Sequence, residues 1–461
     1  MPLIEQSSPH LHVAAFAFPF GSHPRPLLSL VLKLATAAPQ VHFSFFNTEK
    51  SNETLFSSSK SSQLPHNFRA YSVDDGVPAG HVLSGHPLEA VEFFLKAGAE
   101  SFKKGIDIAL AETGTNITCF LMDGFVVFAG EIAGDLGIPW IPVWCPLSCS
   151  LSAHFYTDLI RKLYANNGVV NESQNLDQIP GLSFMKIGDL PGELISPDLD
   201  KSIFAKTLSE LGQVLPRATA IVINFFEELN PAALNDDHKS KFRKVFNVGF
   251  LTISLPLSPQ PPPESDSTGC LSWLNGQKPK SVAYVSFGTV VATPQTELVA
   301  MAEALEESGV PFLWSLRDNL KEALPTGFVG RTSNMGKIVP WTPQTQVLAH
   351  ESVGVFVTHG GCNSVFESIA CGVPMICRPF FGDHQMTGRM VEDFWGIGVT
   401  VEGGVITKKG LIKNLELVLN DEQGKKMRET VEVLKQIVTD AGGPNGSAAR
   451  DFQNLLELVS T

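Results

Sequence analysis

The sequence predicts an α/β protein made of two doubly wound, Rossmann-like domains that face each other across a cleft. The chain has 461 residues, which suits two large α/β domains. Short apolar segments alternate with segments of helical spacing, and this alternation stops at a proline-rich stretch and then restarts. Unbroken apolar strands separated by helices are typical of parallel sheets covered on both faces.

The first half of the chain repeats a unit of strand, loop and helix. Residues 12–18 form an apolar run short enough for a buried strand, and turn residues and the helical pattern LLSLVLKLATAA follow it. The same criteria predict the next elements in order: strand 41–46, helix 87–111, strand 118–122, helix 125–136 and strand 139–144.

A proline-rich segment, LPLSPQPPPESDS, predicts the domain boundary because it cannot form the interior of a helix or sheet. We expect a first domain at 1–250, a linker at 251–268 and a second domain at 269–439, with the C-terminal helix at about 440–461 packing back on the first domain. In the second domain we expect strands at 281–287, 311–316, 353–359 and 373–379, and helices at 295–308 and 363–371.

Composition excludes several classes of protein. Lys and Arg total 34 against 47 Asp and Glu, a net charge of −13, which argues against nucleic acid and anionic membranes as partners. The N-terminal apolar stretch lacks a preceding basic region, and no run is long enough for a transmembrane helix. The seven cysteines form no metal-like CxxC pairs. We expect a cytoplasmic monomer whose partners are small molecules.

The most informative stretch is 341–385, which begins with a predicted strand ending at His359. Gly361 and its glycine neighbour allow a tight turn, and Asn363 or Ser364 is expected to cap the following helix. A helix N-terminus binds anions, so we place a pyrophosphate here. Because the nearest Arg lies well beyond the turn and there is no Lys, helix N–H groups and the His359 imidazole are expected to supply most of the neutralisation.

Other side chains of this stretch suit the rest of a sugar nucleotide. Glu367 falls on the helix face of the cap residues and can accept hydrogen bonds from a ribose diol. Asp383 and His384 follow the next strand, at the end where open α/β sheets bind ligands. Trp341 offers an aromatic face for a base, and Gln344 offers an amide beside it.

The stretch closely resembles the signature box of plant family 1 UDP-sugar-dependent glycosyltransferases, and the resemblance to their flavonoid 3-O-glycosyltransferase branch covers nearly the whole chain. It implies a GT-B fold, an inverting mechanism without metal or cofactor, a flavonoid acceptor, and a UDP-sugar co-substrate bound by the C-terminal domain. The residues in register are Trp341, Pro343, Gln344, His350, His359, Gly361, Asn363, Ser364, Glu367, Gly372, Pro374, Pro379 and Asp383, and further matches are FPFGSHPRPLL, GQVLPRATAIVINFFEEL, SVAYVSFGTV and ICRPFFGD.

The resemblance also assigns residues outside the box. His23 and Asp123 follow predicted strands and correspond to the general base and the carboxylate that orients it, a pair suited to removing a phenolic proton. Ser286 and Thr289 resemble residues near the donor phosphates, and His154 resembles an acceptor contact. Aromatic residues that either line the acceptor pocket or belong to the plain core are Phe16, Phe18, Phe20, Phe125 and Phe155.

Three positions depart from the family pattern. Cys362 replaces the usual Trp and is expected to act through its backbone N–H. Cys145 stands where relatives often carry a hydroxyl near the sugar O6. His384 replaces the Gln common in glucose-using relatives, and in the family His here accompanies UDP-galactose. We therefore expect transfer of galactose from UDP-galactose to the 3-hydroxyl of a flavonol or anthocyanidin, with UDP-glucose as the alternative donor.

Rival classes leave the box unexplained. A metal-dependent GT-A transferase would need a DxD motif, and Asp198-Leu-Asp200 matches only as letters in a proline-flanked loop. No GxGxxG follows the first strand and no GxSxG elbow occurs, which argues against an oxidoreductase and a serine hydrolase. A catalytically silent sugar-nucleotide-binding protein is the non-enzyme alternative, and the presence of both His23 and Asp123 argues against it.

Overall fold

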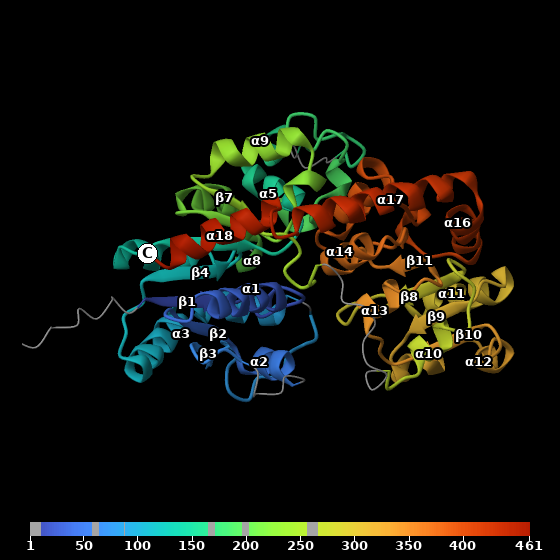
Figure 1. The fold of residues 1–461 in the computed structure, drawn as a ribbon, viewed down its shortest axis with the longest axis horizontal. Coiled ribbons are helices and arrows are strands. Elements are labelled where there is room, and N and C mark those ends of the chain that lie inside the picture. The colour runs from blue at the N-terminus through green and yellow to red at the C-terminus, as the bar shows by residue number, and fades with distance from the viewer. Residues whose placement is uncertain (1–10, 58–63, 87, 165–170, 196–201, 256–265) are drawn as a thin grey trace, which may run out of the picture.

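The computed structural model describes residues 11–57, 64–86, 88–164, 171–195, 202–255 and 266–461. They form two parallel sheets, of seven and six strands, each flanked by helices (Figure 1). The first sheet has the order β3-β2-β1-β4-β5-β6-β7 and the second the order β10-β9-β8-β11-β12-β13. The predicted fold class, two Rossmann-like α/β domains, is confirmed.

In the first sheet every strand pair is parallel, and the three central strands are buried along their whole length. The strands are β1 His12–Phe16, β2 His42–Thr48, β3 Phe68–Val73, β4 Cys119–Asp123, β5 Trp140–Trp144, β6 Ile221–Ile223 and β7 Val245–Asn247. The helices of this part are α1 Pro24–Ala37, α2 Glu49–Phe56, α3 Glu89–Thr113, α4 Phe128–Leu136, α5 Ser148–Phe155, α6 Thr157–Tyr164, α7 Gly192–Ile195, α8 Ile203–Val214 and α9 Ala232–Lys241.

The second sheet is parallel as well. Its strands are β8 Val282–Ser286, β9 Phe312–Ser315, β10 Gly336–Val339, β11 Val353–Thr358, β12 Met375–Cys377 and β13 Gly398–Thr400. The helices that accompany it are α10 Cys270–Leu274, α11 Gln295–Ser308, α12 Phe328–Arg331, α13 Gln344–Leu348, α14 Cys362–Cys371, α15 His384–Arg389, α16 Lys408–Asn420 and α17 Glu422–Ala441, and α18 Ser447–Val459 ends the chain.

The strand order of each sheet reverses beside its first strand, so β1 lies between β2 and β4, and β8 lies between β9 and β11. Open α/β sheets bind ligands at the carboxyl ends of the strands flanking such a reversal. In this protein Asp123 is the last residue of β4, and the segments that follow β1 and β11 carry His23 and His359. The topology therefore places the predicted catalytic and donor residues at the functional edges of the two sheets.

Aromatic and ionic contacts join the two parts of the chain. The Phe250 and Phe366 rings stack with centroids 4.3 Å apart, and the Trp395 indole N–H donates to the Leu229 carbonyl at 2.9 Å. The Arg389 Nε lies 2.9 Å from Asp189 Oδ2. One hydrophobic cluster includes buried residues of both halves, so the domains share part of their core.

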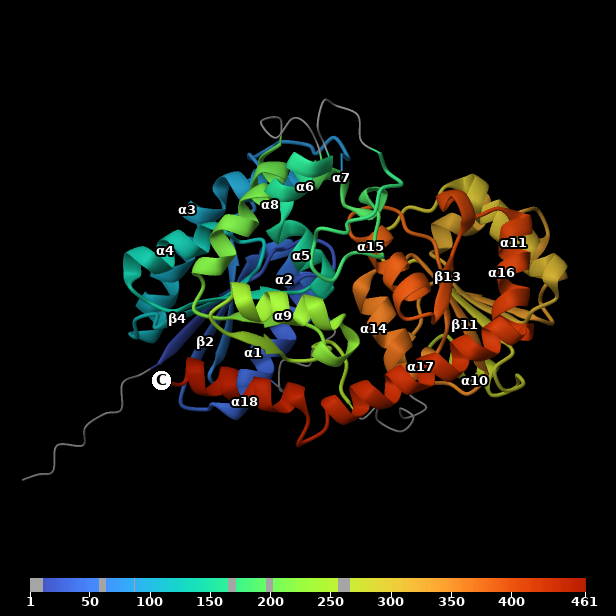
Figure 2. The ribbon, with the colours of Figure 1, turned by 90° about the horizontal axis from the view of Figure 1, so that it is seen from above.

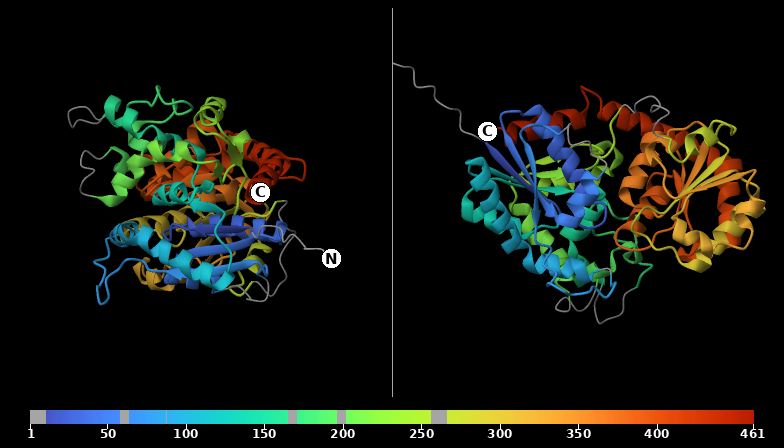
Figure 3. Two further views of the ribbon diagram at one scale, coloured as in Figure 1. Left: turned by 90° about the vertical axis from the view of Figure 1, so that its left-hand side faces the viewer. Right: turned by 90° about the horizontal axis from the view of Figure 1, so that it is seen from below.

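The last two helices cross from one domain to the other (Figure 2). Helix α17 packs on α14, and α18 packs on β7, where the Asn247 N–H donates to Asp451 Oδ2 at 2.7 Å. Leu455 and Val459 are buried in the cluster beside the first sheet, so the chain ends next to the N-terminal domain (Figure 3). Residues 256–265, most of the predicted linker, lie outside the described residues. None of the described helices is both long and apolar enough to cross a membrane.

Candidate active site

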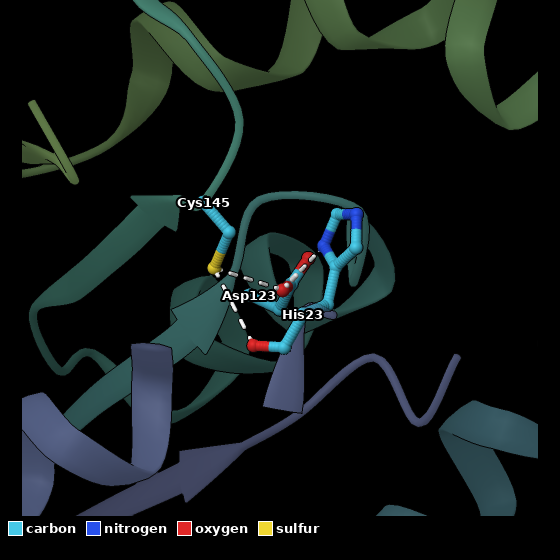
Figure 4. A group of neighbouring side chains, drawn as sticks. All are labelled: His23, Asp123 and Cys145. Atoms are coloured by element: carbon cyan, nitrogen blue, oxygen red, sulfur yellow. Dashed lines mark hydrogen bonds and ion pairs between the residues drawn. The ribbon is translucent and has the colours of Figure 1, made fainter. Parts of the chain in front are cut away.

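His23 and Asp123, which are 100 residues apart in the sequence, meet at the carboxyl end of the first sheet. His23 immediately precedes α1, and Pro24 fixes the first helical position after it. Asp123 is the last residue of β4, the strand beside β1. His23 Nδ1 lies 2.9 Å from Asp123 Oδ2, and its other ring nitrogen points away from the carboxylate (Figure 4). The structure thus brings the predicted base and carboxylate together.

The Asp123 carboxylate is held on both oxygens. Its Oδ1 accepts a hydrogen bond from the Phe125 backbone N–H at 3.0 Å, and Oδ2 accepts from Cys145 Sγ at 3.4 Å as well as from His23. The side chain is only 1% exposed, so these bonds face little competition from water. They fix the carboxylate and leave His23 Nε2 as the reactive nitrogen.

The pKa of His23 is raised above its ordinary value. Burial by itself lowers it, but the negative charge of Asp123, the hydrogen bond to Asp123 and the more distant charge of Asp383 together outweigh burial. An imidazole with a raised pKa is a stronger base and accepts a proton more readily.

Aromatic side chains surround the imidazole. The Phe125 ring centroid lies 4.8 Å from that of His23, and His154 lies 5.8 Å from Phe125. Phe20 joins this group through Phe18, whose ring lies 5.1 Å from that of Phe20 and 5.3 Å from that of His23. The predicted acceptor residues His154, Phe20 and Phe125 are therefore grouped around His23, and burial and the charge of His23 lower the pKa of His154 to about 3.

On the other sheet, the turn after β11 leads into α14, and the predicted helix cap is wrong. The N-cap is Gly361, so Cys362, Asn363 and Ser364 are the first three helical residues. No side chain caps this helix: Ser364 Oγ instead accepts from Gln344, and Asn363 Oδ1 has no partner within the described residues. The N–H groups of the first turn therefore stay available to an anion.

His359, the residue before this turn, is a neutral imidazole in the structure. Burial and the neighbouring His384, whose ring centroid lies 5.0 Å away, lower the pKa of His359 to about 3. The ring is neutral near pH 7, so it can donate a hydrogen bond to a phosphate but adds no positive charge. A Cβ at Gly361 would collide with the His359 Nε2 atom, which explains the glycine at this position.

Glu367 is fixed by two side chains of α13. Gln344 Nε2 donates to Glu367 Oε2 at 2.5 Å, and Thr345 Oγ1 donates to Oε1 at 2.6 Å. The Tyr284 hydroxyl orients the amide by donating to Gln344 Oε1 at 3.1 Å. Trp341, three residues before α13, is 58% exposed, so most of this residue is open to solvent. The predicted base and ribose residues are therefore neighbours.

The remaining donor residues also follow strand ends. Asp383 Oδ2 accepts from Cys362 Sγ at 3.1 Å, so the side chain of Cys362 has a role in addition to the expected backbone N–H. His384 is only 7% exposed, and its Nδ1 has no partner within the described residues. Ser286 ends β8 and is buried, and Thr289 is exposed in the next turn.

His23, Asp123 and Cys145 are the one set of described residues that offers three potential metal-ligand atoms within 4.8 Å of one another. Both the imidazole and the thiol already direct their hydrogen bonds to Asp123 Oδ2. The arrangement therefore suits proton transfer better than metal binding.

Two facing Rossmann-like domains, with an imidazole–carboxylate pair on one and an uncapped helix N-terminus on the other, are the arrangement that the resemblance to GT-B glycosyltransferases predicts. Residues 264–440 match the family described as UDP-glucoronosyl and UDP-glucosyl transferase. This match and the relatives described next, which match nearly the whole chain, together show that the protein belongs to that family. The predicted class of enzyme is therefore confirmed.

Those relatives include flavonoid-modifying enzymes. The chain is 51% identical to an anthocyanidin 3-O-galactosyltransferase of Rhododendron delavayi over 97% of both chains, and 50% identical to a flavonol 3-O-glucosyltransferase of Actinidia chinensis over 98% of this chain and 97% of that one. A crystal structure of a UDP-glucose:anthocyanidin 3-O-glucosyltransferase in complex with UDP matches with a TM-score of 0.91 and 48% identity, over 97% of this chain and 98% of that one. The resemblance to the flavonoid 3-O-glycosyltransferase branch is confirmed.

Proposed function

We propose that this protein transfers a hexose from a UDP-hexose to the 3-hydroxyl of a flavonoid, with inversion and without a metal ion. UDP-galactose is the first donor and UDP-glucose the alternative. The observation that carries the proposal is the His23 Nδ1 to Asp123 Oδ2 hydrogen bond of 2.9 Å, which leaves Nε2 among aromatic side chains. The named activities of the relatives support the choice of flavonoid acceptor.

In the proposed reaction, His23 Nε2 removes the proton of the flavonoid 3-hydroxyl. The resulting oxygen attacks the anomeric carbon on the face opposite the diphosphate, so the new C–O bond forms while the bond to the phosphate oxygen breaks. UDP leaves and the configuration inverts. Asp123 stabilises the imidazolium that forms, as a carboxylate does for a general-base histidine.

The leaving diphosphate is the second charge to be stabilised. We assign this task to the free N–H groups at the start of α14, assisted by a hydrogen bond from neutral His359 and by Ser286 and Thr289. Glu367 then accepts hydrogen bonds from the ribose, while Trp341 and Gln344 contact the base. Because the helix terminus supplies the electrostatic stabilisation, no divalent cation is required, and excess EDTA is expected to leave activity unchanged.

The donor sugar is assigned to Asp383 and His384. Glucose and galactose differ in the orientation of the C4 hydroxyl, so a few hydrogen bonds must discriminate between them. His384 is buried with an unpartnered Nδ1, and an unpaired polar group in a closed site discriminates more strongly than one in water. Relatives of nearly equal identity are named for each sugar, so sequence similarity alone does not choose the donor.

The decisive test measures UDP release by purified protein with a flavonol and either UDP-hexose, and determines the anomeric configuration of the product by NMR. We expect a β-linked 3-O-hexoside and about a 10²- to 10⁴-fold loss of turnover in His23→Ala, the usual share of a positioned base. A protein that binds UDP but releases none from UDP-hexose would instead be the silent binding protein. Near wild-type turnover in His23→Ala would refute the assignment of the base.

We also propose a cytoplasmic monomer. All seven cysteines are unpaired in the structure, which fits a reducing compartment. Light scattering and fractionation of the native tissue test the two statements separately.

A further inference from the structure

Cys145 joins the ends of three adjacent strands of the first sheet. It directly follows β5, which pairs with β4, so its side chain reaches Asp123. Its Sγ lies 3.4 Å from Asp123 Oδ2 and 3.6 Å from the backbone carbonyl oxygen of His23, which follows β1 (Figure 4). The side chain is 6% exposed, so these contacts are made away from bulk water.

Cys145 stands where relatives often carry a hydroxyl near the sugar O6, and in this structure its Sγ contacts Asp123 and the backbone carbonyls of His23 and Val143. A thiol has one hydrogen to donate, and the carboxylate oxygen is both the nearest acceptor and the charged one. Burial and the Asp123 charge keep the thiol protonated, because both raise its pKa well above the ordinary value. The group facing Asp123 is therefore a neutral S–H donor rather than a repelling thiolate.

We propose that Cys145 is a positioning residue for catalysis: its S–H holds Asp123 in the rotamer that meets His23 Nδ1. This inference rests on the proposed roles of His23 and Asp123. Because Asp123 Oδ2 accepts both hydrogen bonds, the bond from the thiol reduces the negative charge that this oxygen offers to the imidazolium. A thiol is a weak donor and reduces this charge little, whereas a hydroxyl at the same position would reduce it more. The residue thereby adjusts the basicity of His23.

Substitutions at Cys145 separate the thiol's effect from simple packing. Cys145→Ala and the larger Cys145→Val both remove the donor, and Cys145→Ser replaces it with a stronger one. We expect about a 3- to 10-fold lower kcat in Ala and Val, the usual effect of one lost hydrogen bond. In Cys145→Ala and Cys145→Val, Asp123 accepts a side-chain hydrogen bond from His23 alone, so the pKa of His23 should rise and the acidic limb of the pH–kcat profile should move to higher pH. In Cys145→Ser the stronger donor should lower the pKa of His23 and move the limb to lower pH.

The matched control is Cys119→Ala, which removes another buried thiol, at the opposite end of β4 from Asp123. It should leave the pH profile unchanged. Titration of ¹⁵N-labelled histidine by NMR in the unliganded protein measures the His23 pKa directly and does not depend on turnover. The KM for the UDP-hexose should stay within about twofold of wild type in the Cys145 variants.

The outcomes separate this inference from the proposed function. Suppose that His23→Ala is inactive, but that Cys145→Ala, Cys145→Val and Cys145→Ser all keep the wild-type pKa of His23 and the wild-type acidic limb. Cys145 is then not a positioning residue. A changed KM for the UDP-hexose with an unchanged limb would assign Cys145 to the sugar instead and overturn the inference. Retained activity in His23→Ala would refute the catalytic pair itself.

Discussion

At the scale of single residues, the environment gives identical imidazoles different roles. Asp123 raises the pKa of His23 in spite of burial, whereas burial without a carboxylate partner lowers the pKa of His154 and His359 to about 3. Of these three, only His23, which has a carboxylate partner, is suited to carry a proton during the reaction. His154 and His359 are neutral near pH 7.

Asp123→Asn tests this difference. The amide removes the negative charge but leaves His23 buried, so the pKa of His23 should fall and the acidic limb of kcat/KM should move to lower pH. Turnover should also fall by about 10²- to 10⁴-fold, because the amide does not stabilise the imidazolium. Rates measured from pH 5 to 9 check both effects. An unchanged limb would show that Asp123 does not set the basicity of His23.

His384→Gln tests the donor assignment at a second single residue. We expect the wild type to prefer UDP-galactose in kcat/KM and the variant to shift the ratio of the two donors at least about tenfold toward UDP-glucose, which corresponds to about 1.4 kcal/mol. Comparing kcat/KM for both donors in both proteins measures the shift. A wild type that prefers UDP-glucose would contradict the galactose assignment, and an unshifted ratio would show that His384 is not the determinant.

At the scale of elements, one buried ion pair ties the end of β12 to α11. Arg378 Nε and Nη2 donate to the two Glu297 oxygens at 2.9 and 2.6 Å, and the guanidinium lies 3.7 Å from the Phe380 ring centroid. Glu297 is 3% exposed and also accepts from the Ile406 N–H at 2.9 Å. Arg378 is therefore committed to the fold and does not neutralise the donor diphosphate.

Glu297→Gln should destabilise the protein by about 3–5 kcal/mol, since it leaves the Arg378 charge buried without its partner. Urea unfolding monitored by Trp fluorescence measures the change. Glu306→Gln is the matched control, because it breaks the Arg331–Glu306 pair, whose side chains are 49% and 33% exposed. A solvent-screened pair contributes little. Equal losses in the two variants would contradict the importance of burial.

At the scale of the whole molecule, buried neutral histidines make stability depend on pH. Burial lowers the pKa of His238 to about 4, and those of His154 and His359 to about 3, in both domains. Each contributes stability that is present above the unfolded pKa of about 6.5 and is lost as the pH falls toward the folded value. His23 acts in the opposite direction, because its folded pKa is raised: its contribution is present below about pH 6.5 and lost at higher pH.

We therefore expect the free energy of unfolding to fall between pH 7 and pH 5, by up to about 1.4 kcal/mol per histidine for each pH unit below 6.5. His238→Gln should reduce this pH dependence, because Gln does not titrate. Gln can still bond to Ser152, whose Oγ lies 2.9 Å from His238 Nε2, so the variant keeps this hydrogen bond. Urea midpoints at both pH values measure the effect. A steeper pH dependence in the variant would be inconsistent with a neutral His238.

The sequence by itself determined the class of fold, the long buried strands and the composition of the site. The runs at 12–18, 118–122, 139–144 and 353–359 are mostly apolar because both faces of their strands are covered, so their pattern is visible without a structure. It did not reveal β3, an edge strand with exposed residues, or β6, β7 and β13, which have three residues each, or β10, which is half-buried. Short and edge strands leave too few buried positions to form a pattern.

Only the tertiary structure decided how the site residues meet and what charge they carry. The gathering of His23, Asp123 and Cys145 depends on the register of β1, β4 and β5, which brings together residues about a hundred positions apart. The neutral state of His359 depends on burial by other segments of the chain. Residue type and spacing carry local information. The pKa of a side chain depends instead on desolvation and on hydrogen-bond partners, which are supplied by segments distant in sequence.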